Sequence, residues 1–154
     1  MVSDREQVYS QLEKARQQLL AAVDGLKPEQ MTVPMMGDWS VKDILAHVAS
    51  WEEFALPDLR RAAKSHIPAL ASFREAEVDD WNRMLMSLRR NFPLDQVTTE
   101  LKEYREATIA ALDALPDERL AQGQFPWIMA MITVRHDREH AEDITKWRQK
   151  EGLK

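Results

Sequence analysis

Apolar residues recur at steps of three and four along several long stretches of the chain, the pattern of amphipathic helices that bury one face. The first stretch has its stripe at Val8, Leu12, Ala15, Leu19, Val23 and Leu26. The second has its stripe at Val41, Ile44, Val48, Trp51 and Ala55. Further along, the same spacing joins Val97, Leu101, Tyr104, Thr108, Ala111 and Leu115. No stretch alternates apolar and polar residues in a way that predicts a strand.

Residues typical of helix ends mark where these helices should begin and stop. Residues 3–6, 40–43 and 72–75 each place a serine three positions before an acidic residue, which is the pattern of a capping box. Pro57 should kink or end the second helix near Leu56, because proline lacks the backbone N–H that a helix interior needs.

The predicted fold is therefore an all-α four-helix bundle, in a single domain that covers residues 1–154. The third and fourth bundle helices are expected at 94–115 and at about 127–150. An extra short helix around Trp81 should lie in the connection from 57 to 93, between the second and third bundle helices. That connection is long enough to cross over the bundle.

Composition narrows the classes of function. The chain has 154 residues, a formal net charge of −5 and no Cys, which excludes disulfides and thiolate chemistry. An acidic domain lacks the basic stripe of nucleic-acid-binding proteins, so no nucleic-acid partner is expected. No apolar run approaches the roughly 18 residues of a membrane span, and the polar N-terminus does not resemble a signal peptide. We therefore expect a cytoplasmic protein with no membrane partner.

Histidines supply the candidate chemistry. His136 and His140 stand at i and i+4, so on a helix both rings point to one side and can reach one ion. Their positions fall on one predicted apolar stripe with Met129, Ile132, Ile144 and Trp147. His47 lies at the edge of the stripe of the second helix. Each could instead be a hydrogen-bonded core residue, and His66 is interpreted as an ordinary surface residue.

Together, His47, His136 and His140 would give three nitrogen ligands and leave a position open for water or substrate, as catalytic metal sites do. Carboxylates that could orient the rings are Asp43, Glu139 and Asp143. For Asp43 the capping role is the favoured interpretation, since it lies in the first turn of its helix. Aromatic and Met side chains nearby either form core or line an apolar pocket, for which the candidates are Trp51, Met129 and Trp81.

Two segments carry a resemblance to a known family. Residues 37–48, followed by Trp51 and Glu52, resemble the second-helix motif of the DinB/YfiT-like superfamily, and the run 136–140 resembles the histidine pair of its last helix. Residues 26–31 and 112–116 extend the resemblance over most of the chain. The stretch 78–82 and the start of the second helix are most similar to the ClbS/DfsB-like branch.

The resemblance implies a four-helix bundle, frequently a homodimer, with a divalent metal held by His47, His136 and His140. Zn²⁺, Ni²⁺ and Fe²⁺ all suit imidazole ligands, and the sequence does not choose among them. Some relatives are thiol-dependent enzymes, namely mycothiol-dependent maleylpyruvate isomerase and bacillithiol transferases. A low-molecular-weight thiol is therefore a candidate cofactor, and the substrate would be a small electrophilic molecule.

Three functions stay open at this point. The first is a metal-dependent enzyme that activates water or a thiol at the histidine site. The second is a ClbS-like hydrolase or resistance protein acting on a reactive small molecule, as members of that branch open a cyclopropane of a genotoxin. The third is a non-enzymatic bundle that binds a small ligand or a partner. The third predicts no pocket at the histidines, or one filled by Trp51 and Met129.

Overall fold

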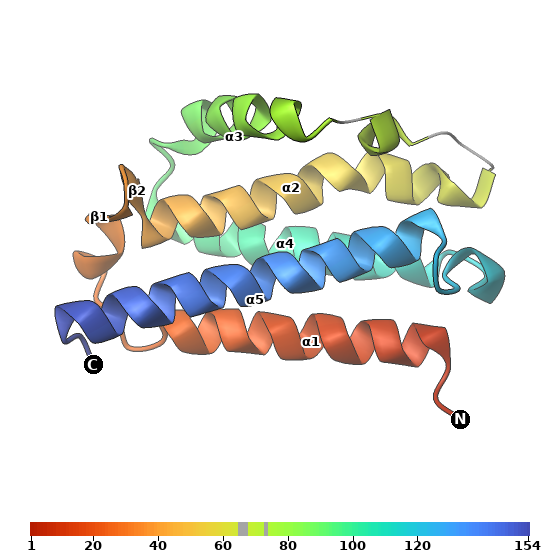
Figure 1. Ribbon diagram of the computed structural model, residues 1–154, viewed down its shortest axis with the longest axis horizontal. Helices are drawn as coiled ribbons and strands as arrows, with labels where there is room; N and C mark the ends of the chain where they lie inside the picture. Colours follow the sequence, from red (N-terminus) through yellow and green to blue (C-terminus); the bar gives the residue numbers. More distant parts are fainter. Residues whose placement is uncertain (65–67, 73) are drawn as a thin grey trace.

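The computed structural model describes residues 1–64, 68–72 and 74–154. Within these residues, a bundle is formed by α1 (Asp4–Val23), α2 (Val41–Arg61), α4 (Leu94–Asp113) and α5 (Phe125–Glu151). The shorter α3 (Glu75–Arg89) runs along the outside of α2 (Figure 1). The predicted four-helix bundle with an extra helix in the long connection is therefore confirmed.

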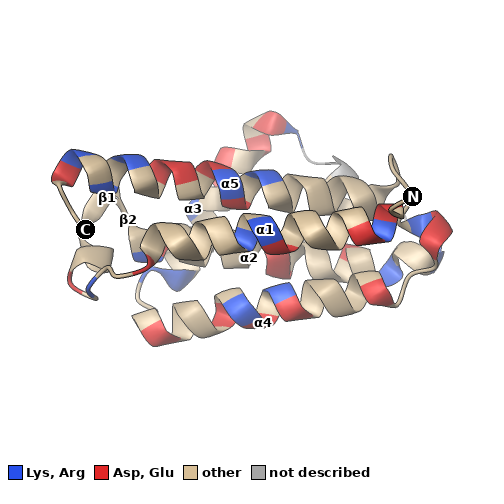
Figure 2. Cartoon of the chain, turned by 90° about the horizontal axis from the view of Figure 1, so that it is seen from below, with Lys and Arg blue, Asp and Glu red and all other residues tan. Residues whose placement is uncertain are grey.

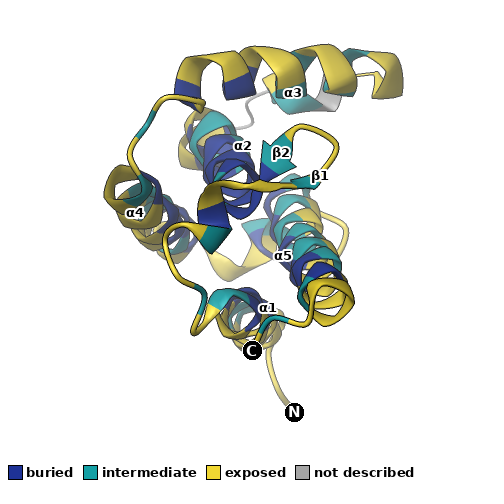
Figure 3. Ribbon diagram, turned by 90° about the vertical axis from the view of Figure 1, so that its left-hand side faces the viewer, coloured by how far each residue is buried: buried dark blue, intermediate teal, exposed yellow. Residues whose placement is uncertain are grey.

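The bundle helices run in two parallel pairs. Figure 1 shows α1 and α5 running in one direction and α2 and α4 in the other. Seen from the end of the bundle, α5 lies beside both α1 and α2, while α4 lies on the other side of α2 (Figure 3). Because α2 and α4 point the same way, the chain must return along the bundle between them, and α3 is the returning segment.

Two of the three predicted capping boxes are present. The backbone N–H of Ser3 donates to Glu6 Oε2 (2.9 Å), and that of Ser40 donates to Asp43 Oδ2 (3.0 Å). In return, both serine hydroxyls accept from the backbone three residues on. The third box, at 72–75, includes Phe73, which lies outside the described residues. There, α3 begins at Glu75 with Arg74 as its N-cap, so the predicted start, with Ser72 as N-cap, is two residues early.

Pro57 does not end α2, contrary to the sequence prediction. The helix continues to Arg61 with Pro57 in its interior. A proline in the interior of a helix lowers its stability by about 3 kcal/mol. Contacts of the residues that follow Pro57 offset this loss. Leu59 is buried in the core, and the carboxylate of Asp58 accepts the backbone N–H groups of Ala69 and Leu70 (3.1 Å each). These contacts hold the last turn of α2 in place.

A small hairpin precedes α2, and it was not predicted from the sequence. β1 (Pro34–Met36) pairs antiparallel with β2 (Trp39–Ser40). Its turn contains Gly37 at φ 58°, a left-handed conformation that glycine adopts without strain. Single turns of 3₁₀ helix complete the described structure at Gln30–Thr32 (η1), Ala62–Lys64 (η2), Ala69–Ser72 (η3) and Asp117–Arg119 (η4). Strands as short as β1 and β2 contain too few residues to show an alternation of apolar and polar positions in the sequence.

A layer of buried charge divides the apolar core into two halves. Each bundle helix contributes one residue to this layer, which consists of Arg16, Glu52, Arg105 and Asp137. One half of the core lies around Leu19, Ile44, Leu101 and Ile144. The other lies around Leu12, Leu56, Leu112 and Val134. On every bundle helix the charged residue falls between the core residues of the two halves, so the layer crosses the bundle.

Within the charge layer, both arginines bind both carboxylates. The guanidinium of Arg16 donates to Glu52 Oε1 (2.5 Å) and to Asp137 Oδ2 (3.1 Å). That of Arg105 donates to Glu52 Oε1 (2.9 Å) and to Asp137 Oδ2 (2.7 Å). Their remaining N–H groups reach the backbone carbonyls of Leu101 and Leu12. Two positive and two negative charges thus cancel in a region where an unpaired charge would be costly.

The outer faces of the bundle carry charges of both signs. Figure 2 shows acidic and basic residues alternating along α1, α4 and α5 without a face of one sign. Among the described residues, no helix combines the length and the apolar character that crossing a membrane would require.

Replacing Arg105 with Met should lower the free energy of unfolding by about 3–5 kcal/mol, because it leaves two buried carboxylates to share one guanidinium. Chemical denaturation at neutral pH measures the change. The matched control is Lys102→Met, on an exposed position of the same helix, which should shift stability by less than about 0.5 kcal/mol. Equal midpoints for the two variants would show that the charge layer does not hold the bundle together.

Candidate metal centre

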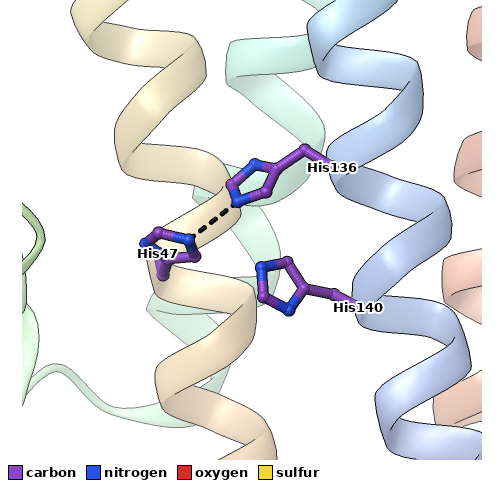
Figure 4. A group of neighbouring side chains, drawn as sticks. All are labelled: His47, His136 and His140. Atoms are coloured by element: carbon purple, nitrogen blue, oxygen red, sulfur yellow. Dashed lines mark hydrogen bonds between the residues drawn. The ribbon is translucent and has the colours of Figure 1, made fainter. Parts of the chain in front are cut away.

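Three histidines from two helices meet beside the charge layer. α2 supplies His47, and α5 supplies His136 and His140 (Figure 4). The Nε2 atoms of His47 and His136 lie 2.7 Å apart, close enough for one ring to donate to the other. One nitrogen from each ring lies within 4.8 Å of the others, and no other such group of His, Asp and Glu occurs among the described residues.

The histidine pair lies at the side of the buried face of α5 rather than at its centre. The most buried positions of this helix include Asp137 (0% exposed) and Ile144 (0%), which face the core. His136, one position before Asp137, is turned toward α2 instead. Ile132, which the predicted stripe placed in the core, is 41% exposed. The actual apolar face is rotated because a buried carboxylate, which no hydrophobic pattern detects, occupies its middle.

Burial and mutual repulsion keep the rings neutral. Loss of hydration, together with repulsion from His136 and His140, lowers the pKa of His47 to about 2. Loss of hydration, together with the charge of His140, lowers the pKa of His136 to about 4. The pKa of His140 is also lowered by burial, against the opposing effect of Asp143. Neutral imidazoles are the form that binds a metal ion.

The three carboxylates that were predicted to orient the histidine rings have different partners. Asp43 is occupied by the cap of α2, where Oδ2 accepts from the backbone and hydroxyl of Ser40. Glu139 is exposed and lies 3.7 Å from Arg135. Asp143 Oδ2 lies 3.5 Å from Nδ1 of His140, too far for a good hydrogen bond but in the position of an orienting group.

The donor set fits a divalent metal ion. Nδ1 of His47 and Nδ1 of His140 are buried without a hydrogen-bond partner, and buried polar nitrogens without partners are uncommon. The rings are neutral and turned toward a common centre (Figure 4). Three imidazole nitrogens suit Zn²⁺, Ni²⁺ or Fe²⁺. An ion at this centre would be held by His47, His136 and His140.

Cavities border the histidines on two sides. The less open of the two, the enclosed cavity of about 280 Å³, reaches His47 and His136, and its apolar lining consists of Val48, Trp51, Val78, Met129 and Ile132. A wider cavity of about 600 Å³ reaches His47 and His140 between α3 and the hairpin. Small molecules could therefore approach the cluster from either side.

The predicted pocket residues do not all lie at the cluster. Trp51 and Met129 line the enclosed cavity. Trp81 lines neither cavity, and its ring packs against Phe54 at a centroid distance of 4.7 Å. Sequence reasoning missed Asn82, which borders both cavities and accepts the indole N–H of Trp51 (2.7 Å). The sequence signal for Asn82 was that it is a polar residue on the packed face of a short helix.

Sequence comparison identifies the family. The model of the DinB superfamily matches residues 11–144, so the chain belongs to the DinB superfamily. No curated protein matches the chain.

Solved structures show the same fold at low sequence identity. A crystal structure of an uncharacterised protein from Escherichia coli UTI89 has a TM-score of 0.83 and 12% identity, covering 97% of this chain and 95% of that one. The colibactin self-resistance protein ClbS, in complex with double-stranded DNA, has a TM-score of 0.80 and 14% identity, covering 95% of each chain. The resemblance to the superfamily is confirmed, and the ClbS similarity agrees with the suggested branch.

The expectation that nucleic acid is excluded as a partner is wrong. It was drawn from the net charge of −5. ClbS, a protein of the same fold, was crystallised with double-stranded DNA. Net charge averages over the whole surface, whereas a nucleic acid contacts one face, so an acidic total is not sufficient ground to exclude such a partner.

The metal-free protein should lose stability as the pH falls from about 6.5 to about 5. The folded state holds His47 and His136 at pKa values of about 2 and 4, whereas the unfolded chain takes up protons near 6.5. Stability therefore falls by up to about 1.4 kcal/mol per pH unit for each histidine. Denaturation at several pH values measures this slope. His47→Gln should make it shallower, and an unchanged slope would contradict the assigned burial.

Proposed function

We propose that this protein is a metal-dependent enzyme in which His47, His136 and His140 hold a divalent ion beside a small-molecule cavity. The main support for the proposal is that three neutral, largely buried imidazoles place one nitrogen each within 4.8 Å of the others, while Nδ1 of His47 and Nδ1 of His140 have no hydrogen-bond partner. When bound, the ion would act as a Lewis acid and lower the pKa of a water or a low-molecular-weight thiol placed against it.

The chain's own residues would hold and orient the reactants. Trp51 and Met129 provide an apolar surface beside His136, suited to a small electrophilic substrate. The hydrogen bond from Trp51 to Asn82 fixes the indole ring against α3. Asp143 is placed to accept the Nδ1 proton of His140, which would keep the opposite nitrogen free as a ligand.

A second candidate is protection against a reactive small molecule. It is favoured by the fold shared with ClbS, whose name describes it as a self-resistance protein. In this case the enclosed cavity would hold the reactive molecule for hydrolysis. Because ClbS was crystallised with double-stranded DNA, a labelled duplex belongs among the ligands to be tested.

The cavities argue against a purely structural role for the histidines. A non-enzymatic bundle would have no pocket at the cluster, or would fill it with Trp51 and Met129. Instead, these two side chains line a cavity of about 280 Å³.

Metal binding can be measured directly. The protein, stripped with a chelator and then titrated with Zn²⁺, Ni²⁺ or Fe²⁺, should take up one ion per chain and become more stable. An ion at 100 times its dissociation constant adds about 2.7 kcal/mol. His136→Ala should abolish both effects, while Lys146→Ala, exposed on the same helix, should preserve them. Equal metal uptake by the two variants would show that His136 is not a metal ligand and would contradict the proposed site.

Catalysis can be tested on the metal-loaded protein. Consumption of a chromogenic electrophile, with and without a low-molecular-weight thiol, should be about 100-fold or more slower for His136→Ala than for wild type. A thiol requirement would favour transferase chemistry, and turnover in water alone would favour hydrolysis. If cells expressing His136→Ala resist an electrophilic toxin as well as cells expressing wild type, the ion plays no part in the protection.

A further inference from the structure

The two cavities at the histidine cluster differ in the charges that line them. In the enclosed cavity, the carboxylate of Glu52 is already bound by Arg16 and Arg105. Its other charged residues, Arg135 and Glu139, lie 3.7 Å apart and offset each other. This cavity therefore has no excess of positive charge to attract an anionic ligand, and its apolar lining suits an uncharged one.

The wide cavity presents two arginines against one aspartate. The guanidinium of Arg90 donates to the backbone oxygen of Asp38 (3.2 Å) and has no carboxylate partner among the described residues. Arg83 pairs with Asp80 on the surface of α3, and both side chains are largely exposed. Exposed pairs of this kind are weak, so Arg83 can exchange its partner for a ligand at little cost.

The two cavities adjoin at Asn82 and His47. Asn82 lines both of them and accepts the indole N–H of Trp51, which ties α3 to α2 between them. His47 borders both cavities, whereas His136 borders the enclosed one and His140 the wide one. A ligand in either cavity reaches the cluster without entering the other.

We propose that the cluster receives two ligands at once. A small carboxylate-bearing molecule binds in the wide cavity through Arg83 and Arg90, and an uncharged apolar molecule binds in the enclosed cavity against Trp51. The inference rests on the proposed function for the role of the histidines, but it assigns substrate classes that the metal site alone does not. Bidentate guanidinium contacts are the physical basis for selecting a carboxylate.

Binding can be measured by NMR on the metal-free protein, using the indole N–H signals as local probes. Succinate should shift the signal of Trp39, which lines the wide cavity, and benzene should shift that of Trp51. Succinamide, the uncharged diamide of succinate, is the matched control ligand and should bind more weakly. Saturating benzene should change the dissociation constant of succinate by less than twofold.

Variants locate the carboxylate subsite. Arg83→Gln should weaken succinate binding by about fivefold, as expected for losing one partly exposed charge contact, and should leave benzene binding unchanged. Lys102→Gln removes an equal charge from α4, away from both cavities, and should change neither.

The inference fails if succinamide binds as tightly as succinate, if the two variants behave alike, or if benzene displaces succinate. None of these results bears on metal binding, because the measurements use the metal-free protein. Conversely, if the wild-type protein takes up no metal, the proposed function is wrong, but the two proposed ligand subsites are unaffected.

Discussion

Two guanidinium groups and two carboxylates meet in the middle of the bundle, with one group supplied by each bundle helix. Each member would be an uncompensated buried charge without the others, so the four helices are constrained to one register along the bundle axis. Apolar side chains alone do not impose such a register, because hydrophobic contacts are non-directional and tolerate sliding. The arrangement of α1, α2, α4 and α5 therefore depends on this layer.

The candidate metal centre follows from that register. Asp137 anchors α5 directly beside His136, and Glu52 anchors α2 five residues after His47. Fixing the two carboxylates therefore fixes the distance between the two rings. Burying three imidazoles lowers the stability of the bundle. The lowered pKa values of the three histidines reflect the same loss of hydration. Placing α3 outside α2 leaves room for cavities on both sides of the cluster.

Much of the fold could be predicted from the sequence, because apolar spacing and serine caps report local structure. The bundle, its crossover helix and the caps at Ser3 and Ser40 belong to this part. The charge layer could not be predicted, since Arg16 and Asp137 look like surface residues in a hydrophobic pattern. The passage of α2 through Pro57 depends on tertiary contacts of Asp58 and Leu59. The spacing of His136 and His140 indicated a site, but its cavities depend on where α3 packs.

Whether the three histidines hold one ion can be seen by anomalous diffraction from a crystal of the protein grown after metal loading. We expect a single anomalous peak at the absorption edge of the metal, at about 2.0–2.1 Å from one nitrogen each of His47, His136 and His140. A peak elsewhere on the chain, or no peak from crystals of fully loaded protein, would contradict it.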